Sequence, residues 1–323
     1  LLACSGSDAP TQRGRAKAAP GEPAAGRFRP LDREDPDGDL QALAALGYVD
    51  GTRPPPNEAG ATVLAPEKIQ AGLNLYVSGQ GPEAHLIDRD GQVLHKWAYD
   101  WFAQWPDPRR PGKRTKVFPN HWRRAHLYEN GDLLVMWGGQ GMAKLDKDSQ
   151  FQWGVADRNL HHDLDVAPDG SIWVLDRKPM RIPALSAVGK VVMDTIVVLE
   201  PDGTVRDEIS VFDCFQNSLY SDQILLMPSR GDVLHTNTLT VLPEGFSAPE
   251  FKAGNLLVSF RHTDGIGVID PEKRSLVWYM KGSWNAQHQP VLLSDERMLL
   301  FDNRGLGERS RVLELETRTG DIT

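Results

Sequence analysis

The pattern of hydrophobic and polar positions changes near residue 73. From there to residue 323, short stretches of alternating apolar and polar residues are separated by turns that contain Asp and Gly. Alternation with a period of two predicts strands with one buried face, and an Asp-Gly pair between two such stretches is a strong hairpin signal. We therefore expect residues 73–323 to form an all-β domain.

Two kinds of hairpin alternate along this region. The first has an acidic or Gly turn and often ends in Trp, and its copies run over residues 84–97, 144–153, 197–203, 267–278 and 311–320. The second begins with histidine, and its copies run over residues 126–135, 162–174, 235–258 and 288–301. Two consecutive hairpins make a four-stranded sheet, and tandem four-stranded sheets at this period are the signature of a β-propeller.

The hairpins amount to about four and a half propeller blades. A propeller closes on itself to cover the faces of its sheets and bury its core. The sequence is therefore expected to lack its C-terminal end, and a small, irregular propeller that closes at residue 323 is the alternative.

The N-terminal part has a different character. Residues 5–35 are rich in Ala, Pro, Gly and Arg without apolar periodicity, which predicts a flexible tether. Residues 39–47 have apolar positions at helical spacing and end at Gly47, which predicts one short helix within a linker that spans residues 36–72. The first five residues are similar to the end of a bacterial lipoprotein signal in which Cys4 would carry the lipid. Residues 1–35 are thus expected to be a truncated lipoprotein signal and tether of an exported protein, periplasmic or at the cell surface; a stray Cys at the chain end is the alternative.

Composition narrows the possible partners. The net charge of −8 argues against binding to nucleic acid, which requires a basic surface, but it leaves room for a local cationic pocket that binds a small anion. Without a stretch of 18 apolar residues, the only membrane contact expected is the lipid at Cys4. If Cys4 is lipidated, Cys214 has no partner for a disulfide bond.

The histidine hairpins predict a shared site. In a hairpin, the first residue of one strand and the last residue of the next lie at the same open end. The polar pairs at these ends are His162 with Arg177, His235 with Arg261, and His288 with Asn303. If these strands are the inner ones of successive blades, the pairs converge on one mouth of the central channel.

Other histidines and arginines are given different interpretations. His126 is expected to make a structural contact between blades. The adjacent residues His161 and His162 should point to opposite faces of a strand, and His162 is chosen for the channel because Leu164 and Val166 continue its face. Arg123, with its neighbours in the 121–124 segment, is expected at the rim or in a solvated loop.

The order of several motifs resembles that of the bacterial arylsulfotransferases. These motifs are His161-His162-Asp163, His235-Thr236-Asn237, Ser259-Phe260-Arg261-His262, Gln287-His288 and Phe301-Asp302-Asn303. The resemblance covers roughly residues 73–323. It implies a six-bladed propeller that moves a sulfuryl group from an aryl sulfate to a phenol, without a nucleotide sulfate donor and without a cofactor.

The resemblance also implies roles for individual residues. His288 would be the nucleophile that forms a sulfohistidine, and Arg261 would clamp the sulfuryl oxygens. His235 and Asn237 would bind these oxygens or the bridging phenolic oxygen, while His162 would assist proton transfer. Arg177 and Asn303 remain candidates for substrate binding from their places at the hairpin ends, and no metal is expected.

Two other functions stay open at this point. A calcium-dependent, lactonase-like hydrolase could use the oxygens of Asp176, Asn237, Asp302 and Asn303, although the His and Arg content favours an anionic substrate. A surface lipoprotein whose propeller binds a glycan or a protein, without catalysis, is the second alternative, because a fold does not determine a function.

Overall fold

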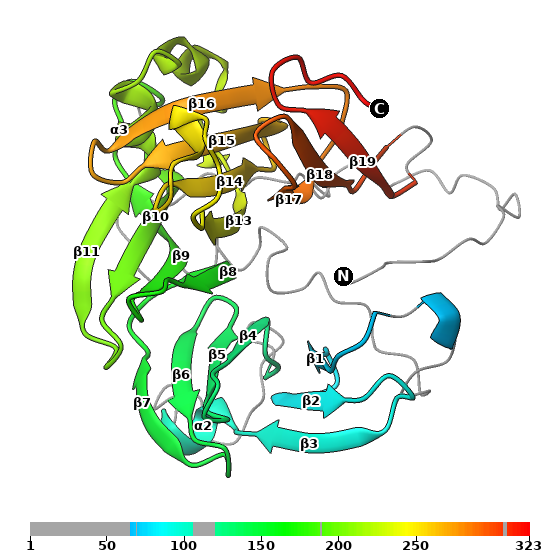
Figure 1. Cartoon of the computed structure of the whole chain (residues 1–323). Helices are drawn as coiled ribbons and strands as arrows, with labels where there is room; N and C mark the ends of the chain where they lie inside the picture. The colour runs from blue at the N-terminus through cyan, green and yellow to red at the C-terminus, as the bar shows by residue number, and fades with distance from the viewer. Residues whose placement is uncertain (1–64, 69, 106–119, 188, 306–308) are drawn as a thin grey trace, which may run out of the picture.

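A computed structural model of the chain describes residues 65–68, 70–105, 120–187, 189–305 and 309–323. In this part of the chain, five sheets follow one another in sequence and are arranged around a common centre (Figure 1). Within each sheet, consecutive strands pair in antiparallel fashion. This arrangement confirms the predicted all-β propeller.

The strands have the following bounds. The first sheet holds β1 (Asn74–Val77), β2 (Glu83–Ile87) and β3 (Val93–Ala98). The second holds β4 (Arg124–Leu127), β5 (Leu133–Trp137), β6 (Gly141–Leu145) and β7 (Phe151–Val155). The third holds β8 (Leu160–Val166), β9 (Ile172–Met180), β10 (Val191–Leu199) and β11 (Val205–Ser210), with β12 (Gly231–Asp232) parallel to β10. The fourth holds β13 (Thr236–Val241), β14 (Leu256–Phe260), β15 (Gly265–Asp270) and β16 (Ser275–Lys281), and the fifth holds β17 (His288–Leu292), β18 (Arg297–Asp302) and β19 (Arg311–Glu316).

Short helices occur outside the sheets. They are η2 (Pro66–Lys68), α2 (Trp101–Gln104), α3 (Val211–Gln216), η3 (Ser221–Leu226) and η4 (Pro249–Phe251). Helix α3 was not predicted; it begins after Ser210, whose hydroxyl accepts a hydrogen bond from the amide of Asp213, as at many helix N-termini. No helix in the described ranges is both long and apolar enough to cross a membrane.

Strands β8, β13 and β17 lie next to one another at the centre, and side chains fix their relative positions (Figure 1). The carboxylates of Asp163 and Asp165 in β8 accept hydrogen bonds from the amides of Leu239 and Val241 in β13, at 3.0 and 2.9 Å. The amide of Gln289 in β17 donates to the Thr238 hydroxyl in β13, at 2.9 Å. Neighbouring blades are therefore tied together close to the propeller axis.

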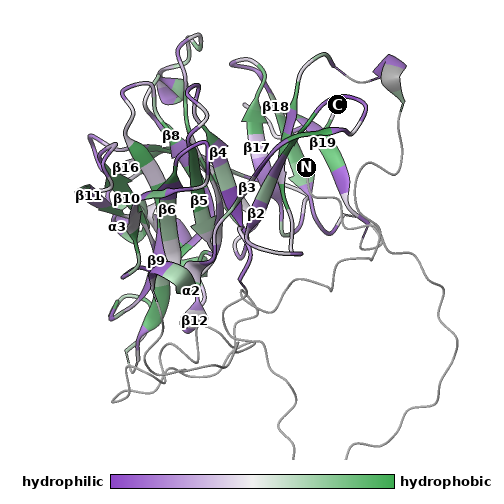
Figure 2. Cartoon of the chain, turned by 90° about the horizontal axis from the view of Figure 1, so that it is seen from below, coloured by the Kyte–Doolittle hydropathy of each residue, from purple (hydrophilic) through white to green (hydrophobic). Residues whose placement is uncertain are grey.

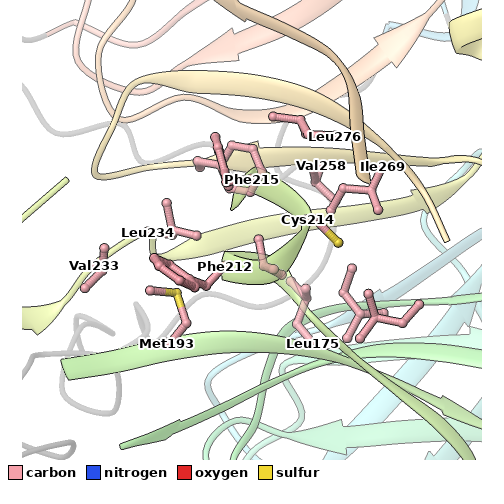
Figure 3. Close-up of a cluster of buried hydrophobic side chains, with 14 of the residues drawn as sticks. Leu175, Met193, Phe212, Cys214, Phe215, Val233, Leu234, Val258, Ile269 and Leu276 are labelled. Carbon is pink, nitrogen blue, oxygen red and sulfur yellow. The ribbon is translucent and has the colours of Figure 1, made fainter. Parts of the chain in front are cut away.

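Apolar side chains fill the spaces between the sheets. The most extensive cluster joins the third and fourth sheets to α3, and it includes Cys214, Phe215 and Val258 (Figure 3). In Figure 2, hydrophobic residues are concentrated in the strands. Burial of these faces is the main force that holds consecutive blades together.

One detail separates the structure from the expectations. The region counted as about four and a half blades forms five sheets, because the first hairpin pairs with β1 into a sheet of its own. The helix expected over residues 39–47 and the lipid carrier Cys4 lie outside the described residues.

Candidate active site

The inner strands of three successive blades are interrupted by the same kind of bulge. The strand register shifts between Leu160 and Leu164 in β8, between Thr236 and Thr238 in β13, and between His288 and Val291 in β17. At or beside each shift one residue has a left-handed backbone: His162 (φ 55°), His235 (φ 54°) and Gln289 (φ 48°). Side chains other than glycine adopt this conformation at a cost of about 1–3 kcal/mol, and such residues gather at functional sites.

The bulges bring five histidines together, which we call the histidine cluster: His161, His162, His235, His262 and His288. The ring of His162 is central, with centroids at 5.3 Å from His161, 5.1 Å from His235 and 6.5 Å from His288. The rings of His235 and His262 are 4.4 Å apart. The predicted convergence of His162, His235 and His288 is thus what the geometry shows.

Two arginines act on this cluster. Arg261 follows β14, and its amide donates to the carbonyl of His235 at 3.2 Å. Burial lowers the pKa of His288 to about 4, and the charges of Arg261 and Arg123 act in the same direction. Burial also lowers the pKa of His162 well below 6.5, with the charge of Arg123 as the next cause. The imidazoles of His162 and His288 are therefore neutral at pH 7 and lie in a cationic environment suited to an anion.

The proton of His288 has a defined position. Its Nδ1 lies 3.0 Å from the carbonyl oxygen of Ala286, and a carbonyl can only accept a hydrogen bond. Nδ1 must therefore carry the proton, and Nε2 keeps the lone pair. The side chain is half-buried, so a small molecule can reach it. A neutral imidazole in this tautomer is a competent nucleophile.

His235 is held by a buried carboxylate. Its Nδ1 lies 2.9 Å from Oδ2 of Asp232, and its amide donates to Oδ1 of the same residue at 3.2 Å. Burial lowers the pKa of His235 to about 3 although Asp232 opposes this effect. Burial would raise the pKa of Asp232, but His235, His262 and Arg177 together hold it below its ordinary value. The neutral ring of His235 therefore donates to an ionised Asp232.

Asp232, His235 and His262 are also close enough to hold a metal ion, with one ligand atom from each within 4.8 Å of the others. However, Nδ1 of His262 lies 2.9 Å from the Asp232 carbonyl oxygen. The charges of Arg177 and Arg261 act on the same residues, and they oppose a bound cation. The arrangement therefore suits hydrogen bonding to an anion better than metal binding.

Asn237 connects β13 to the segment that carries the nucleophile candidate. Its side-chain amide nitrogen donates to the carbonyl of Gln287 at 2.7 Å. The side chain of Gln287 is fully buried, and its amide nitrogen donates to the carbonyl of Gly265 at 2.8 Å. Asn237 thus positions the residue that precedes His288, whereas its role as a substrate ligand stays a prediction.

The other predicted residues lie at different depths. Arg177, in β9, is buried and acts on Asp232 behind His235. Asn303 lies in the turn after β18, where its carbonyl accepts from the Ser310 hydroxyl at 3.3 Å. His126 lies in β4 with its ring 4.9 Å from that of Tyr128. These contacts are structural, and substrate binding by Arg177 and Asn303 stays a prediction.

The oxygen ligands considered for a lactonase-like site are used by other groups. Asp176 accepts from the amide of Arg177 and from the Arg158 guanidinium. Asp302 accepts from the amide of Asn285 and from Nε of Arg311. These carboxylates serve as structural acceptors in two different blades.

Sequence reasoning missed Arg123 and Asp232 as parts of the site. Arg123 is expected at the rim or in a solvated loop, yet its charge acts on His162, His288 and His121. Asp232 lies three residues before His235, and this spacing was the available signal, because the carboxylate accepts from the His235 amide and faces its ring.

Comparison with known protein families agrees with the resemblance seen in the sequence motifs. The family model of arylsulfotransferases (ASST) matches residues 124–322. No curated protein matches the chain significantly. Among solved structures, the chain is similar to a protein of unknown function from Bacteroides caccae (14% identity, TM-score 0.46, covering 78% of this chain and 71% of that one). It is also similar to the WD40 β-propeller domain of Doa1 (10%, 0.46, 76% and 61%) and to BamB from Moraxella catarrhalis (10%, 0.38, 79% and 61%). These structural similarities are too weak to support a functional conclusion. The family model, however, spans more than half of the sequence, and the chain therefore belongs to the arylsulfotransferase family.

Proposed function

We propose that the protein transfers a sulfuryl group from an aryl sulfate to a phenol, without a nucleotide sulfate donor, through a sulfohistidine at His288. The observation that carries this proposal is the tautomer of His288: the Ala286 carbonyl keeps the proton on Nδ1, so Nε2 presents a lone pair beside the charges of Arg261 and Arg123. A neutral nucleophile next to fixed cations suits attack on an anionic ester.

The reaction has two steps. In the first, Nε2 of His288 attacks the sulfur of the donor, an N–S bond forms, the bond between sulfur and the phenolic oxygen breaks, and the phenoxide leaves. In the second, the acceptor phenol loses its proton, its oxygen attacks the sulfur, and the N–S bond breaks. His288 returns to its neutral form, and the proton lost by the acceptor balances the one that the first phenoxide takes up.

Stabilisation of the transferring group comes from fixed donors. Sulfuryl transfer, like phosphoryl transfer, depends mainly on in-line positioning and on neutralisation of charge on the equatorial oxygens. The backbone of Arg261 is bonded to that of His235, and the charges of Arg261 and Arg123 both act on His288. Preorganised cations of this kind lower the barrier because they need no reorganisation during the reaction.

The test uses the full chain with 4-nitrophenyl sulfate, with and without a phenol. We expect a burst of nitrophenolate that is stoichiometric with enzyme, turnover only with acceptor, and a sulfuryl adduct on the peptide that contains His288. His288→Asn should abolish all three, while His126→Gln, a histidine in β4 that contacts Tyr128, should change none of them. Nitrophenolate release that persists in His288→Asn would refute the assignment of the nucleophile.

We also propose that the protein is an exported lipoprotein anchored through Cys4, on the basis of the short motif around this residue. The full-length precursor should partition into detergent after expression, and Cys4→Ala should move it to the aqueous phase. Equal partitioning of both proteins would refute the anchor.

A further inference from the structure

A buried carboxylate lies behind the histidine cluster, in a residue that the mechanism above does not use. Asp194 is in β10, and it is completely inaccessible to solvent. Its Oδ2 accepts hydrogen bonds from the amide and the hydroxyl of Thr236, both at 2.6 Å. Its Oδ1 lies 3.3 Å from Nε2 of His161, which is also buried. A carboxylate without solvent needs such partners to remain in the fold.

The contact continues from His161 to His162. The Nδ1 atoms of the two rings are 3.0 Å apart, so one of them donates a hydrogen bond to the other. If Nε2 of His161 donates its ring proton to Asp194, the Nδ1 of His161 is the acceptor. His162 must then donate from Nδ1, and its lone pair is on Nε2, on the far side of the ring.

We propose that Asp194 and His161 form a relay that holds His162 as the general base for the acceptor phenol. This inference rests on the proposed sulfuryl transfer. The phenolic proton goes to Nε2 of His162 while the phenolic oxygen bonds to sulfur and the N–S bond at His288 breaks. The resulting imidazolium donates through His161 to the carboxylate, and it returns the proton to the phenoxide that leaves the next donor molecule. Asp194 and His161 are positioning residues, since neither contacts the substrate.

The surroundings of His162 explain why a relay is needed. Arg123, His235, His161 and His288 all face this ring, and each of them disfavours a positive charge on it. The carboxylate of Asp194 is the negative group that the two hydrogen-bonded rings connect to His162. A general base in this position contributes about 10²–10⁴-fold to the rate.

The decisive variant is Asp194→Asn, because its outcome follows from hydrogen-bond direction. The amide of Thr236 can only donate, so the oxygen of the new side chain must stay on that side and the NH₂ group must face His161. Nε2 of His161 then becomes the acceptor and its Nδ1 the donor. This change places the proton of His162 on Nε2, and the general base is lost while the shape of the side chain is kept.

The kinetic test separates the two steps. With 4-nitrophenyl sulfate, whose leaving group needs no proton, Asp194→Asn should keep the burst rate within about threefold of the wild type. Transfer from the sulfohistidine to phenol should slow by about 10²-fold or more. The defect should shrink with more acidic phenols, which ionise without a base. Equal loss in both steps, or a defect that does not depend on acceptor acidity, would overturn the relay; absence of a burst in the wild type would instead refute the proposed function.

A second measurement does not depend on activity. Long-range ¹H–¹⁵N NMR spectra of histidine rings should show His162 protonated on Nδ1 in the wild type and on Nε2 in Asp194→Asn. His161→Asn, which retains an acceptor near the Nδ1 position, should keep the His162 tautomer and part of the activity. Asp165→Asn is the matched control, because Asp165 also joins β8 to β13 but through the amide of Val241. A wild-type His162 protonated on Nε2 would overturn the relay whatever the kinetics show.

Discussion

Acidification should leave the first step of the proposed transfer unaffected until about pH 4. Burial, Arg261 and Arg123 lower the pKa of the nucleophile candidate His288 from 6.5 to about 4. At about 1.4 kcal/mol for each pKa unit, this difference corresponds to roughly 3 kcal/mol in favour of the neutral ring. The pH dependence of the burst rate constant, measured by quenching into alkaline buffer, should therefore lack an acid limb between pH 6 and 7. A limb centred there would refute the reasoning.

The same difference predicts how stability depends on pH. The pKa of His288 is lower in the folded than in the unfolded chain, so between pH 6.5 and about 4 the unfolded chain binds more protons. The contribution of the neutral His288 ring to the free energy of unfolding is fully present above pH 6.5 and is lost as the pH falls from 6.5 to about 4. Relative to His288→Asn, the wild type should lose at most about 3 kcal/mol of unfolding free energy between pH 7 and 4. Arg261→Gln should move the acid limb upward, because it removes one cation that disfavours protonation.

Three further changes test other parts of the site and the core. Arg123→Met should raise the KM for 4-nitrophenyl sulfate about tenfold, since a hydrogen bond to a charged group contributes about 1.5–3 kcal/mol. Arg123→Lys should recover part of this loss of affinity. An unchanged KM would show that Arg123 does not contact the substrate. Asp232→Asn should lower the free energy of unfolding by about 3 kcal/mol in urea titrations, because the Asp232 carboxylate offsets the charge of the buried Arg177. A change below 1 kcal/mol would contradict this electrostatic coupling. Cys214→Ser should destabilise the fold by about 1–3 kcal/mol by placing a hydroxyl in the apolar cluster, whereas Cys214→Ala should destabilise it less. Burial raises the pKa of the Cys214 thiol to about 12, so thiol reagents should modify it only in the unfolded chain.

Topology explains why much of the site was predictable. The hairpin argument placed His235 and Arg261 at one open end, and the structure pairs Thr236 with Phe260 and joins the Arg261 amide to the His235 carbonyl. Likewise, His288 lies opposite Phe301 in β17 and β18. Such positions follow from strand order alone, which a repeating sequence pattern reveals.

Local backbone departures explain what was not predictable. Strict alternation would point His161 and His162 to opposite faces, but the bulge between Leu160 and Leu164 interrupts the register and brings the two Nδ1 atoms to 3.0 Å. The ring of His162 lies at the centre of the histidine cluster, but the bulge, rather than the alternation used to choose this residue, brings it there. The contact between His161 and Asp194 was not predictable either, because Asp194 belongs to another strand and no periodicity in the sequence links it to the histidines.

The left-handed residues at the bulges matter for anyone who wants a more robust form of this protein. Glycine adopts that backbone without a steric penalty, and the strain that it would relieve amounts to about 1–3 kcal/mol. Replacing His235 by Gly would, however, leave the buried Asp232 carboxylate without the ring that faces it, which costs about 3–5 kcal/mol. Glycine substitution at these positions should therefore lower the melting temperature, and engineering for heat resistance should leave the bulges unchanged.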